Sequence, residues 1–385
     1  MTLSGSDTII ALVTHARDVS APERERLAAR LRDEVGRQPI VLETCHRVEA
    51  YTVAAEKDEP LSAWLPIGGR LLAGEAAIRH AISVAVGRDS VVIGEDQILH
   101  QVRELLGQAR RAQIHPVLER LFTVGLRAGR RARSWRNGPP RSLADVAVSV
   151  IERQAGPVAG RELLIVGAGK MGRLAVRSAA AAGARVSVAN RSAGPAETIG
   201  LASGARIEPF DPGPAIDRFA AVIVALGGPW TIGQATLGSL AAGGTVVVDL
   251  SAPAAVPPML VDDLGPRLIS ADALALEDAE PVPDDRSIAR LDTLIDTTTA
   301  EFRAWLDARD GRIAAAALAT RADRDRSAEL DKLWRRLPDL DADARDAIER
   351  MSRHLARRLL REPLARLGRD ADGSRERAAR ELFGL

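Results

Sequence analysis

The only cysteine of the 385-residue chain, Cys45, lies among polar and cationic neighbours. A single thiol cannot form an internal disulfide, so Cys45 is an inert buried residue, a ligand in a mixed metal site, or a nucleophile. Thiolate chemistry needs a lowered pKa, and the adjacent His46 and Arg47 carry groups whose positive charge favours the ionised sulfur. Inert burial is the alternative, because an apolar run ends at Leu42 and free cysteine is commonly buried. The polar flank favours the nucleophile.

A second chemical signature, G-x-G-x-x-G, directly follows the apolar run 163–166. Its residues are Gly167, Ala168, Gly169, Lys170, Met171 and Gly172, and an alanine-rich helical stretch comes next. Such glycines let the chain turn tightly and approach a pyrophosphate, which binds at the positive end of the following helix. Because a predicted strand precedes the motif and a predicted helix follows it, the segment indicates a dinucleotide-binding unit.

The residues Asn190, Arg191 and Ser192 indicate which dinucleotide is bound, since they follow the next apolar strand. Arg191 lies 24 positions after Gly167, where an NAD site usually carries an acid. A guanidinium instead pairs with the extra 2′-phosphate of NADP through charge-assisted hydrogen bonds. A solvent-facing turn arginine is the alternative. NADPH is therefore the expected cofactor, bound by the glycine motif and this turn.

Composition and chain breakers divide the sequence into three predicted domains, which cover 1–140, 141–286 and 287–385. The hydrophobic content of 46% and charged content of 27% are typical of a globular protein with a sizeable core. Gly/Pro-rich stretches at 138–140 and 281–285 mark the boundaries. Further apolar runs at 221–225 and 245–249 predict that the middle domain continues as a parallel sheet.

The C-terminal domain is predicted to be helical, because apolar residues recur three and four positions apart from Ile288 to Leu306. Dimerisation through helices is the favoured interpretation of this pattern, with RNA contact as the alternative. The sequence has no membrane-length apolar run and no signal-peptide pattern, and a single cysteine suits a reducing compartment, so we expect a cytoplasmic protein.

Motifs along nearly the whole chain resemble those of the glutamyl-tRNA reductases, the enzymes that begin tetrapyrrole synthesis from glutamate. Residues 44–49, T-C-H-R-V-E, resemble the family's T-C-N-R-x-E nucleophile segment. Residues 89–102 match its D-S-x-x-x-G-E-x-Q-I-x-x-Q-V block, which is the most specific match in the chain. The N-R-S turn at 190–192 and a degenerate C-terminal signature at 361–367 follow in the family's order.

The resemblance implies an N-terminal α/β catalytic domain, a Rossmann-type NADPH-binding domain, and a C-terminal all-α dimerisation domain with a long connecting helix. It implies reduction of glutamyl-tRNA to glutamate-1-semialdehyde with NADPH. In that reaction the Cys45 thiolate attacks the aminoacyl ester and forms a thioester, a better hydride acceptor than a carboxylate. The implied partners are glutamyl-tRNA, a second copy of the chain in a homodimer, and glutamate-1-semialdehyde aminomutase.

The resemblance also assigns roles to residues at matching positions. Cys45 and His80 are the implied catalytic residues, with His80 as the acid/base or orienting group near the reacting carbonyl. Arg47 is the implied clamp for a substrate carboxylate. The remaining implied substrate contacts are Thr44, Ser90, Glu95, Gln97 and Gln101. A basic segment with Arg130, Arg131 and Arg133 would meet tRNA phosphates or form a solvated helix face.

Several positions depart from the family pattern. Histidine replaces asparagine at position 46 and glycine at position 100, and the loops at 225–228 and 249–255 lack a threonine and an Arg-Asp pair, respectively. These departures leave two alternatives open: a diverged reductase acting on another acyl donor, or a catalytically silent dimeric NADP-binding regulatory protein. Cys45 and the nearby histidines are also zinc-ligand types, but their spacing fits no short zinc signature, so no metal is predicted.

Overall fold

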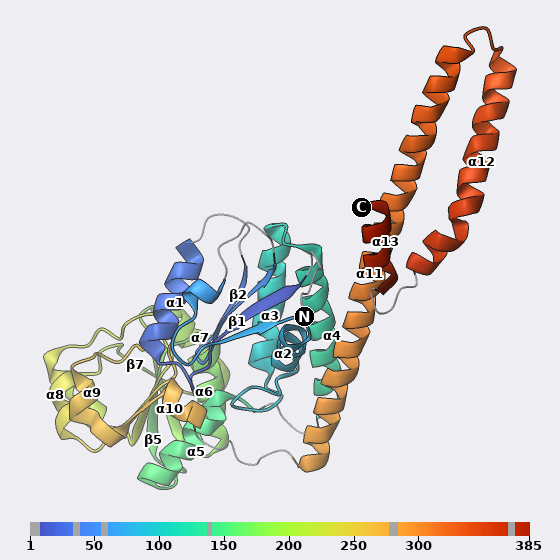
Figure 1. The fold of residues 1–385 in the computed structure, drawn as a ribbon. Coiled ribbons are helices and arrows are strands. Elements are labelled where there is room, and N and C mark those ends of the chain that lie inside the picture. The colour runs from blue at the N-terminus through green and yellow to red at the C-terminus, as the bar shows by residue number, and fades with distance from the viewer. Residues whose placement is uncertain (1–7, 34–38, 55–60, 137–140, 277–283, 369–373) are drawn as a thin grey trace. The chain divides into compact units, whose positions relative to one another are not determined.

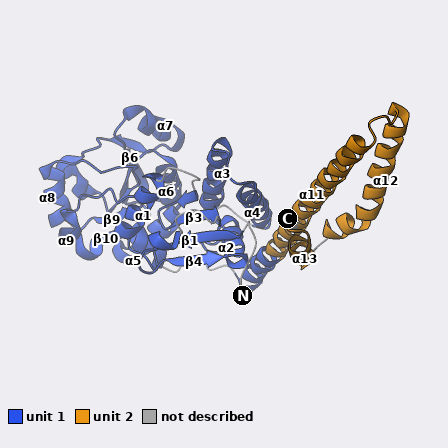
Figure 2. Ribbon diagram, turned by 45° about the horizontal axis from the view of Figure 1, so that its top comes forward, with its two compact units in different colours: residues 1–296 blue, residues 297–385 orange. Residues whose placement is uncertain are grey.

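The computed structural model describes residues 8–33, 39–54, 61–136, 141–276, 284–368 and 374–385. The chain divides into two compact units, residues 1–296 and 297–385 (Figure 2). Two β-sheets with their covering helices make up the first unit, and the described part of the second unit is helical.

The first sheet has four antiparallel strands in the order β2-β3-β1-β4. They are β1 (Ile9–Val13), β2 (Ile40–Glu43), β3 (Val48–Val53) and β4 (Arg70–Ala73). Strands β2 and β3 pair as far as Glu43 opposite Val48, so residues 44–47 form the turn between them. The predicted nucleophile segment is therefore a tight hairpin turn.

Helices α1 (Ala21–Asp33), α2 (Glu75–Val86), α3 (Asp96–Arg111) and α4 (Pro116–Arg133) accompany this sheet, with a short 3₁₀ helix η1 (Leu61–Trp64). Leu27 and Leu31 of α1 pack with Leu12 and Ala50 of the strands in one buried cluster. Helices α2, α3 and α4 lie side by side (Figure 1), and the D-S-x-x-x-G-E segment 89–95 leads directly into α3. The sheet and these helices confirm the predicted N-terminal α/β fold.

The second sheet has six parallel strands in the order β10-β9-β8-β5-β6-β7. They are β5 (Glu162–Val166), β6 (Arg185–Ala189), β7 (Arg206–Glu208), β8 (Ala221–Val224), β9 (Val246–Asp249) and β10 (Leu268–Ser270). The first strand along the chain is central, and the order reverses between β5 and β8, which is the doubly wound order of dinucleotide-binding domains. The predicted Rossmann-type fold is confirmed.

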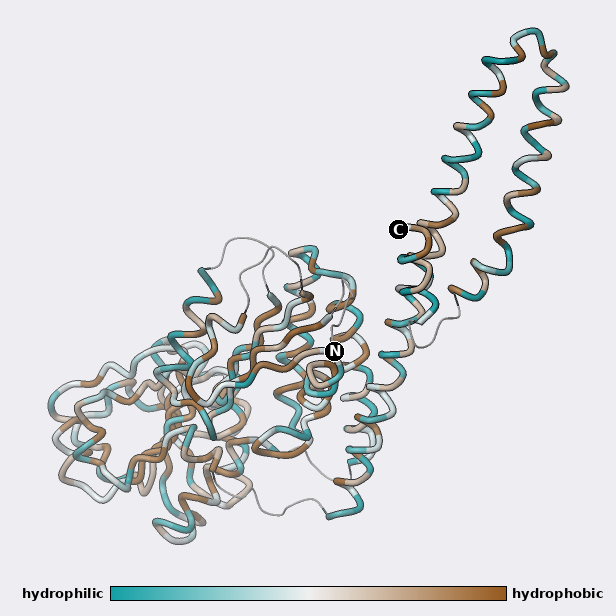
Figure 3. Tube along the Cα trace, in the orientation of Figure 1, coloured by the Kyte–Doolittle hydropathy of each residue, from teal (hydrophilic) through white to brown (hydrophobic). Residues whose placement is uncertain are grey.

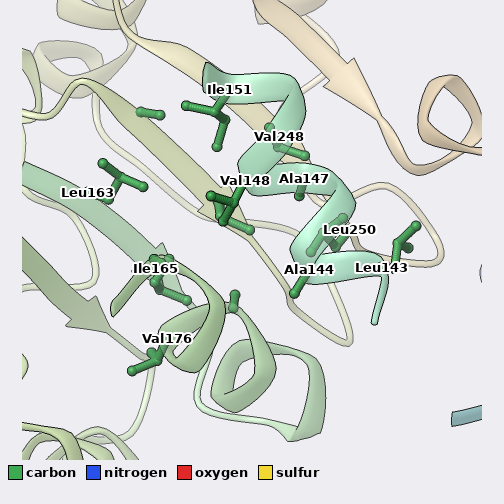
Figure 4. Close-up of a cluster of buried hydrophobic side chains, with 14 of the residues drawn as sticks. Leu143, Ala144, Ala147, Val148, Ile151, Leu163, Ile165, Val176, Val248 and Leu250 are labelled. Atoms are coloured by element: carbon green, nitrogen blue, oxygen red, sulfur yellow. The ribbon is translucent and has the colours of Figure 1, made fainter. Parts of the chain in front are cut away.

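Alternate residues of these strands face two separate buried clusters, one on each side of the sheet. One side packs against α5 (Leu143–Ala155), α6 (Lys170–Ala181), α7 (Ala193–Ser203) and α10 (Ala271–Leu276), and Figure 4 shows its centre, where α5 lies over Leu163, Ile165 and Val248. The other side packs against η2 (Gly213–Arg218), α8 (Gln234–Ala242) and α9 (Leu260–Leu264), and η3 (Gly265–Arg267) precedes β10. Burial on both faces explains why the strands read as continuous apolar runs.

The long helix α11 (Asp285–Arg336) spans 52 residues, and the division between the two units falls within it. In the second unit, α11 is followed by α12 (Ala342–Leu367) and α13 (Ser374–Phe383), which confirms the predicted helical C-terminal domain and long helix. Leu318, Leu367 and Ala379 form a small buried cluster there. The exact boundaries at 140/141 and 286/287 stay predictions, since residues 138–140 and 281–283 lie outside the described ones.

Helix α12 carries apolar side chains that the single chain leaves exposed. Met351, Leu355 and Leu359 recur at four-residue intervals and are 62%, 53% and 68% exposed. Figure 3 shows the corresponding hydrophobic segments along an otherwise hydrophilic helix. Such a stripe indicates a face that packs against a partner. Over the described ranges, no helix has both the length and the apolar character needed to cross a bilayer.

Candidate active site

The turn 44–47 between β2 and β3 holds Cys45 in a defined position. Thr44 Oγ1 accepts hydrogen bonds from the backbone N–H groups of His46 (3.2 Å) and Arg47 (3.1 Å), which closes the turn. Arg24 Nη2 donates to the carbonyl oxygen of Cys45 at 3.1 Å. The backbone on both sides of the sulfur is therefore fixed by polar contacts.

The same turn docks onto the nucleotide-binding sheet and its last helix. Cys45 Sγ lies 3.7 Å from the carbonyl oxygen of Leu250, in the loop after β9. His46 Nε2 lies 2.8 Å from the carbonyl oxygen of Ala271, so this nitrogen carries the proton that is donated. The arginine that holds the Cys45 carbonyl also pairs with Asp272 at 2.5 Å. These contacts bring the thiol to the carboxyl edge of the parallel sheet.

Cys45 lines a narrow cavity of about 30 Å³ together with all six predicted substrate residues. The predicted residues found there are Thr44, Arg47, Ser90, Glu95, Gln97 and Gln101, together with Met171 of the glycine motif. The cavity is also lined by His15, His46, Val91, Ile98 and Leu143. Its volume is enough for about two water molecules. One cavity thus contains the thiol, the residues of the D-S-x-x-x-G-E block and a residue of the dinucleotide motif.

Arg47 is buried in a network of acidic partners. Its Nη1 lies 3.1 Å from Glu49 Oε1 and 3.4 Å from Asp89 Oδ2, and its Nη2 donates to the carbonyl oxygen of Asp89. Burial lowers the pKa of Arg47, but the carboxylates of Glu49 and Asp89 outweigh it and raise the pKa above its ordinary value. Arg47 is therefore a fixed positive charge at the cavity wall.

His80 lies behind this network, and the described residues that line the Cys45 cavity do not include it. Its Nε2 lies 2.9 Å from Glu49 Oε1, and Tyr51 donates its hydroxyl to the other oxygen of Glu49 at 2.6 Å. Burial raises the pKa of Glu49, but His80 and Arg47 outweigh it and lower the pKa to about 2. Of the two roles predicted for His80, this geometry favours orienting over direct proton transfer to a reacting carbonyl.

The expected activation of Cys45 by its cationic neighbours is wrong for this conformation. Burial, and after it the charge of Glu95, raises the pKa of the Cys45 thiol to about 11. Burial also lowers the pKa of His46 to about 4, so its imidazole is neutral near pH 7. Arg47 is engaged by Glu49 and Asp89. The free protein therefore holds Cys45 as a protonated thiol.

Glu95 and Ser90 are the polar groups of this cavity with unusual states. Burial raises the pKa of Glu95 to about 7, against the opposing charges of Arg47 and Arg133. The Ser90 hydroxyl oxygen is buried and has no hydrogen-bond partner in the described structure. A buried hydroxyl without a partner is costly, which indicates a site for a polar ligand group.

The glycine motif between β5 and α6 fits a dinucleotide. Gly167 has φ +119°, and a Cβ there would lie 2.2 Å from the carbonyl oxygen of Ala225, so only glycine is tolerated. A Cβ at Gly169 would meet nothing within 4 Å, which leaves the open approach that a pyrophosphate needs. Asn190 Oδ1 accepts from the N–H of Ala168 at 3.1 Å and its Nδ2 donates to Ser192 O at 2.9 Å, which ties the two predicted cofactor segments together.

Arg191 is exposed at the end of β6, as its predicted role requires. Its guanidinium lies over the ring of Phe210 at 5.8 Å, and Nη2 donates to Pro229 O at 3.2 Å. These contacts orient the guanidinium and leave other N–H donors for a phosphate.

Three residues that hold the site together were not predicted from the sequence to have a role in it. Glu49 joins Arg47 to His80, and His15 lines the cavity with a pKa lowered to about 4 by burial. Arg24 anchors the Cys45 carbonyl. One signal was available for Glu49, which interrupts an apolar strand and is fully buried.

The structure also bears on the basic segment with Arg130, Arg131 and Arg133 and on the zinc-ligand residue types near Cys45. Arg133 donates to carbonyl oxygens at the end of α2, including that of Ala85 at 3.3 Å, and to Glu95 O, so it joins helices instead of facing solvent. Arg130 and Arg131 are exposed. Where the chain is described, no group of three or more His, Cys, Asp or Glu side chains is arranged to hold a metal ion.

Comparison with known proteins gives three matching family models. They are "Glutamyl-tRNAGlu reductase, N-terminal domain" over residues 12–135, "Shikimate / quinate 5-dehydrogenase" over 149–276, and "Glutamyl-tRNAGlu reductase, dimerisation domain" over 290–385. The glutamyl-tRNA reductase of Salinispora arenicola is 32% identical over 380 residues, which cover 90% of this chain and 83% of that relative. That of Roseiflexus castenholzii is 28% identical over 417 residues, with 98% and 97% covered.

The fold also matches a solved structure over its full length. The glutamyl-tRNA reductase from Methanopyrus kandleri aligns with a TM-score of 0.53 and 23% identity, covering 98% of both chains. At this identity the match shows that the folds agree.

Proposed function

Because the chain belongs to the glutamyl-tRNA reductase family, we propose that it reduces glutamyl-tRNA to glutamate-1-semialdehyde with NADPH, using Cys45 as the nucleophile. The observation that carries this proposal is that Cys45 and Met171, which follows directly on the glycine loop, line one cavity. A nucleophile and a hydride donor must reach the same carbonyl carbon, so their sites have to meet.

The reaction has two balanced steps. The Cys45 sulfur bonds to the ester carbonyl carbon, the carbon–oxygen bond to the tRNA ribose breaks, and the thiol proton leaves with the ribose hydroxyl. Bound NADPH would supply the hydride that adds to the carbonyl carbon of the thioester. Breaking of the carbon–sulfur bond then releases the aldehyde, and the departing sulfur takes up a proton to restore the thiol. The raised pKa of Cys45 makes its deprotonation a step that the bound substrate has to assist.

The cofactor residues are those at the carboxyl edge of the parallel sheet. Gly167, Ala168 and Gly169 with the first turn of α6, from Lys170 to Gly172, would hold the pyrophosphate, because the backbone there is open and the helix end is positive. Asn190 would hold the loop, and Arg191 with Ser192 would bind the 2′-phosphate.

Substrate recognition is assigned to the polar residues of the cavity. Arg47 has donors beyond its contacts with Glu49 and Asp89, and these would bind the substrate carboxylate. The unpartnered Ser90 hydroxyl would bind a second polar group of the glutamyl moiety, together with Thr44, Glu95, Gln97 and Gln101 from the same walls. His80 would orient Arg47 through Glu49.

The cavity has to widen before it accepts a substrate. A volume of about 30 Å³ is far too small for a glutamyl group. Two of its lining residues, Cys45 and His46, contact Leu250 and Ala271 outside the cavity. We expect these contacts to part when the aminoacyl end enters and to re-form around the thioester, which would exclude water from it.

The test is a single-turnover reaction of the full-length protein with charged glutamyl-tRNA, with and without NADPH, comparing wild type with Cys45→Ser. Without NADPH, wild type should form a trappable acyl-enzyme at Cys45. With NADPH, it should form the semialdehyde, and Cys45→Ser should do neither. Turnover of a different acyl donor alone would establish a diverged reductase. Cofactor binding with no acylation by any donor would indicate a silent binding protein.

The partners follow from the same family assignment. The chain is a homodimer through its C-terminal domain, and the exposed stripe Met351, Leu355 and Leu359 supplies an apolar face for the contact. We also propose that the reactive aldehyde passes to glutamate-1-semialdehyde aminomutase. A transient complex in cross-linking of the two purified enzymes would support this, and free diffusion of all product into an aldehyde trap would refute it.

A further inference from the structure

A second, larger cavity of about 350 Å³ adjoins the Cys45 cavity and shares Glu95 and Gln97 with it. Its lining is strongly basic. The side chains with basic groups are His100, Arg103, Arg130, Arg141, Lys170 and Arg177. No step of the proposed chemistry uses this cavity.

The helices present these groups in a regular way. Lys170, Leu174 and Arg177 occupy one face of α6, at spacings of four and three residues, and all three line the cavity. His100 and Arg103 are one turn apart on α3, and Arg130 comes from α4. Four separate segments thus direct cationic side chains into one space.

The acidic groups nearby leave this positive charge largely uncompensated. Asp96 is paired with Arg133 (3.2 Å) and Arg136 (3.0 Å), which do not line the cavity. Glu95 is partly protonated near neutral pH, since its pKa is raised to about 7 by burial. Glu104 lies 2.9 Å from His100.

Two of the cavity's arginines are unpaired within the part of the chain that the structure describes. Arg130 and Arg177 form no ion pair with another described residue there, and both are exposed to solvent. Burial lowers the pKa of Lys170, and the charge of Arg103 lowers it further, against the opposing charge of Glu104. A cluster of cationic side chains with few acidic partners is stabilised when an anion binds among them.

The cavity shares Lys170, the first residue of α6, with the predicted dinucleotide site. Its described lining includes neither the glycines 167–169 nor the turn 190–192. It lies along the side of α6, whereas the dinucleotide phosphates belong over the loop at the start of that helix. Its shared wall at Glu95 and Gln97 instead places it next to the thiol.

We infer that this basic cavity binds phosphate groups of the tRNA 3′ end, so that the terminal ester reaches Cys45. The inference rests on the proposed function. In glutamyl-tRNA, only one sugar separates the phosphate of the esterified nucleotide from the reacting carbonyl. When that carbonyl lies at Cys45, the phosphate is close enough to enter the adjoining basic cavity. Arginine forks suit phosphate oxygens, and a flexible single-stranded end needs phosphate contacts to fix it.

The test measures binding of uncharged tRNA, so it does not depend on turnover. The variant Arg130→Gln/Arg177→Gln is compared with Arg127→Gln/Arg173→Gln, which removes exposed arginines of α4 and α6 outside the cavity. Each protein is titrated with intact tRNA and with tRNA trimmed of its 3′-terminal nucleotides. The Kd for tRNA is measured over a range of salt concentrations, and the Kd for NADPH is measured alongside.

Removal of the two cavity arginines should weaken binding of intact tRNA about tenfold, and it should weaken binding of trimmed tRNA less than about twofold. For intact tRNA, the slope of log Kd against log salt concentration should decrease by about one for each arginine removed, as expected for the loss of one phosphate contact. The control variant should keep the wild-type preference for intact tRNA.

Equal losses on intact and trimmed tRNA would overturn the inference, as would no loss on either. A raised Kd for NADPH with unchanged tRNA binding would assign the cavity to a cofactor phosphate instead. If wild type prefers intact tRNA through these arginines but forms no acyl-enzyme, the binding site stands and the proposed reaction fails.

Discussion

The protonation state of Cys45 gives the sharpest test of the site, because it is the only cysteine and alkylation therefore reports on one group. Its pKa is raised from 9.0 to about 11 by burial and by Glu95. Two units correspond to about a hundredfold less thiolate at neutral pH. In the free protein, once Glu95 is ionised above about pH 8, the rate of iodoacetamide alkylation should accordingly rise tenfold per pH unit up to about pH 11.

The substitution Glu95→Gln tests the second cause of this shift. Burial is the larger cause, so removal of the Glu95 charge should recover the smaller part of the deficit, about threefold to tenfold in rate. Glu95 itself ionises with a pKa of about 7. The ratio of variant to wild-type rates should therefore be near one at pH 6 and should rise through pH 7 to a plateau. The cavity restricts access of the reagent equally in both proteins, so this effect is removed when the ratio of their rates is taken.

The control is Asp96→Asn, which removes the neighbouring acid that is paired with Arg133 and Arg136 and does not line the Cys45 cavity. Because Asp96 raises the pKa of Glu95 but has no direct part in the Cys45 shift, this variant should move the Glu95 step to lower pH and leave the alkylation rate above about pH 8 unchanged. Cys45→Ser should not react. A wild-type thiol pKa near 9 or below would refute the reasoning about burial. A rate ratio for Glu95→Gln that does not change across pH 7 would refute the role of the Glu95 charge.

Three further predictions concern the dimer, the cofactor and stability. The double substitution Leu355→Arg/Leu359→Arg should convert the dimer to a monomer of 41.0 kDa in light scattering, and an unchanged mass would show that α12 is not the dimer contact. Arg191→Ala should raise the KM for NADPH about 10- to 100-fold with little effect on NADH, whereas equal effects on both would argue against a 2′-phosphate contact. Folding lowers the His46 pKa from 6.5 to about 4, so its contribution to stability is present above pH 6.5 and is lost as the pH falls towards 4. At pH 5 the free energy of unfolding should be about 2 kcal/mol lower for this reason. In urea unfolding, His46→Asn should reduce the loss of stability between neutral pH and pH 5 by that amount. An unchanged pH dependence would show that His46 is not held neutral.

Most of the fold could be predicted from the sequence, because strands, turns and helices leave patterns among residues that are close together in the chain. Spacing predicted the strand, glycine turn and helix around Gly167 and the helical pattern from Ile288 to Leu306, whereas the long connecting helix was implied by the family resemblance. The sequence also predicted that Cys45, Arg47 and Ser90 belong to one site, and the structure brings them to one cavity.

The protonation states could not be predicted, because they depend on contacts between distant segments. His46 meets Ala271, which is 225 positions away, and Cys45 meets Leu250, which is 205 positions away. Sequence proximity to His46 and Arg47 suggested an activated thiol, but burial against those distant carbonyls has the larger effect and raises the pKa.

The docking of the turn 44–47 against Leu250 and Ala271 affects how readily Cys45 is oxidised. Peroxides oxidise thiolates much faster than thiols, and a sulfur oxidised beyond the sulfenic state is not readily restored. A chain with one cysteine also has no second thiol with which to form a protective internal disulfide. By keeping this sulfur protonated, the conformation described here would protect the proposed nucleophile from oxidative damage while no substrate is bound.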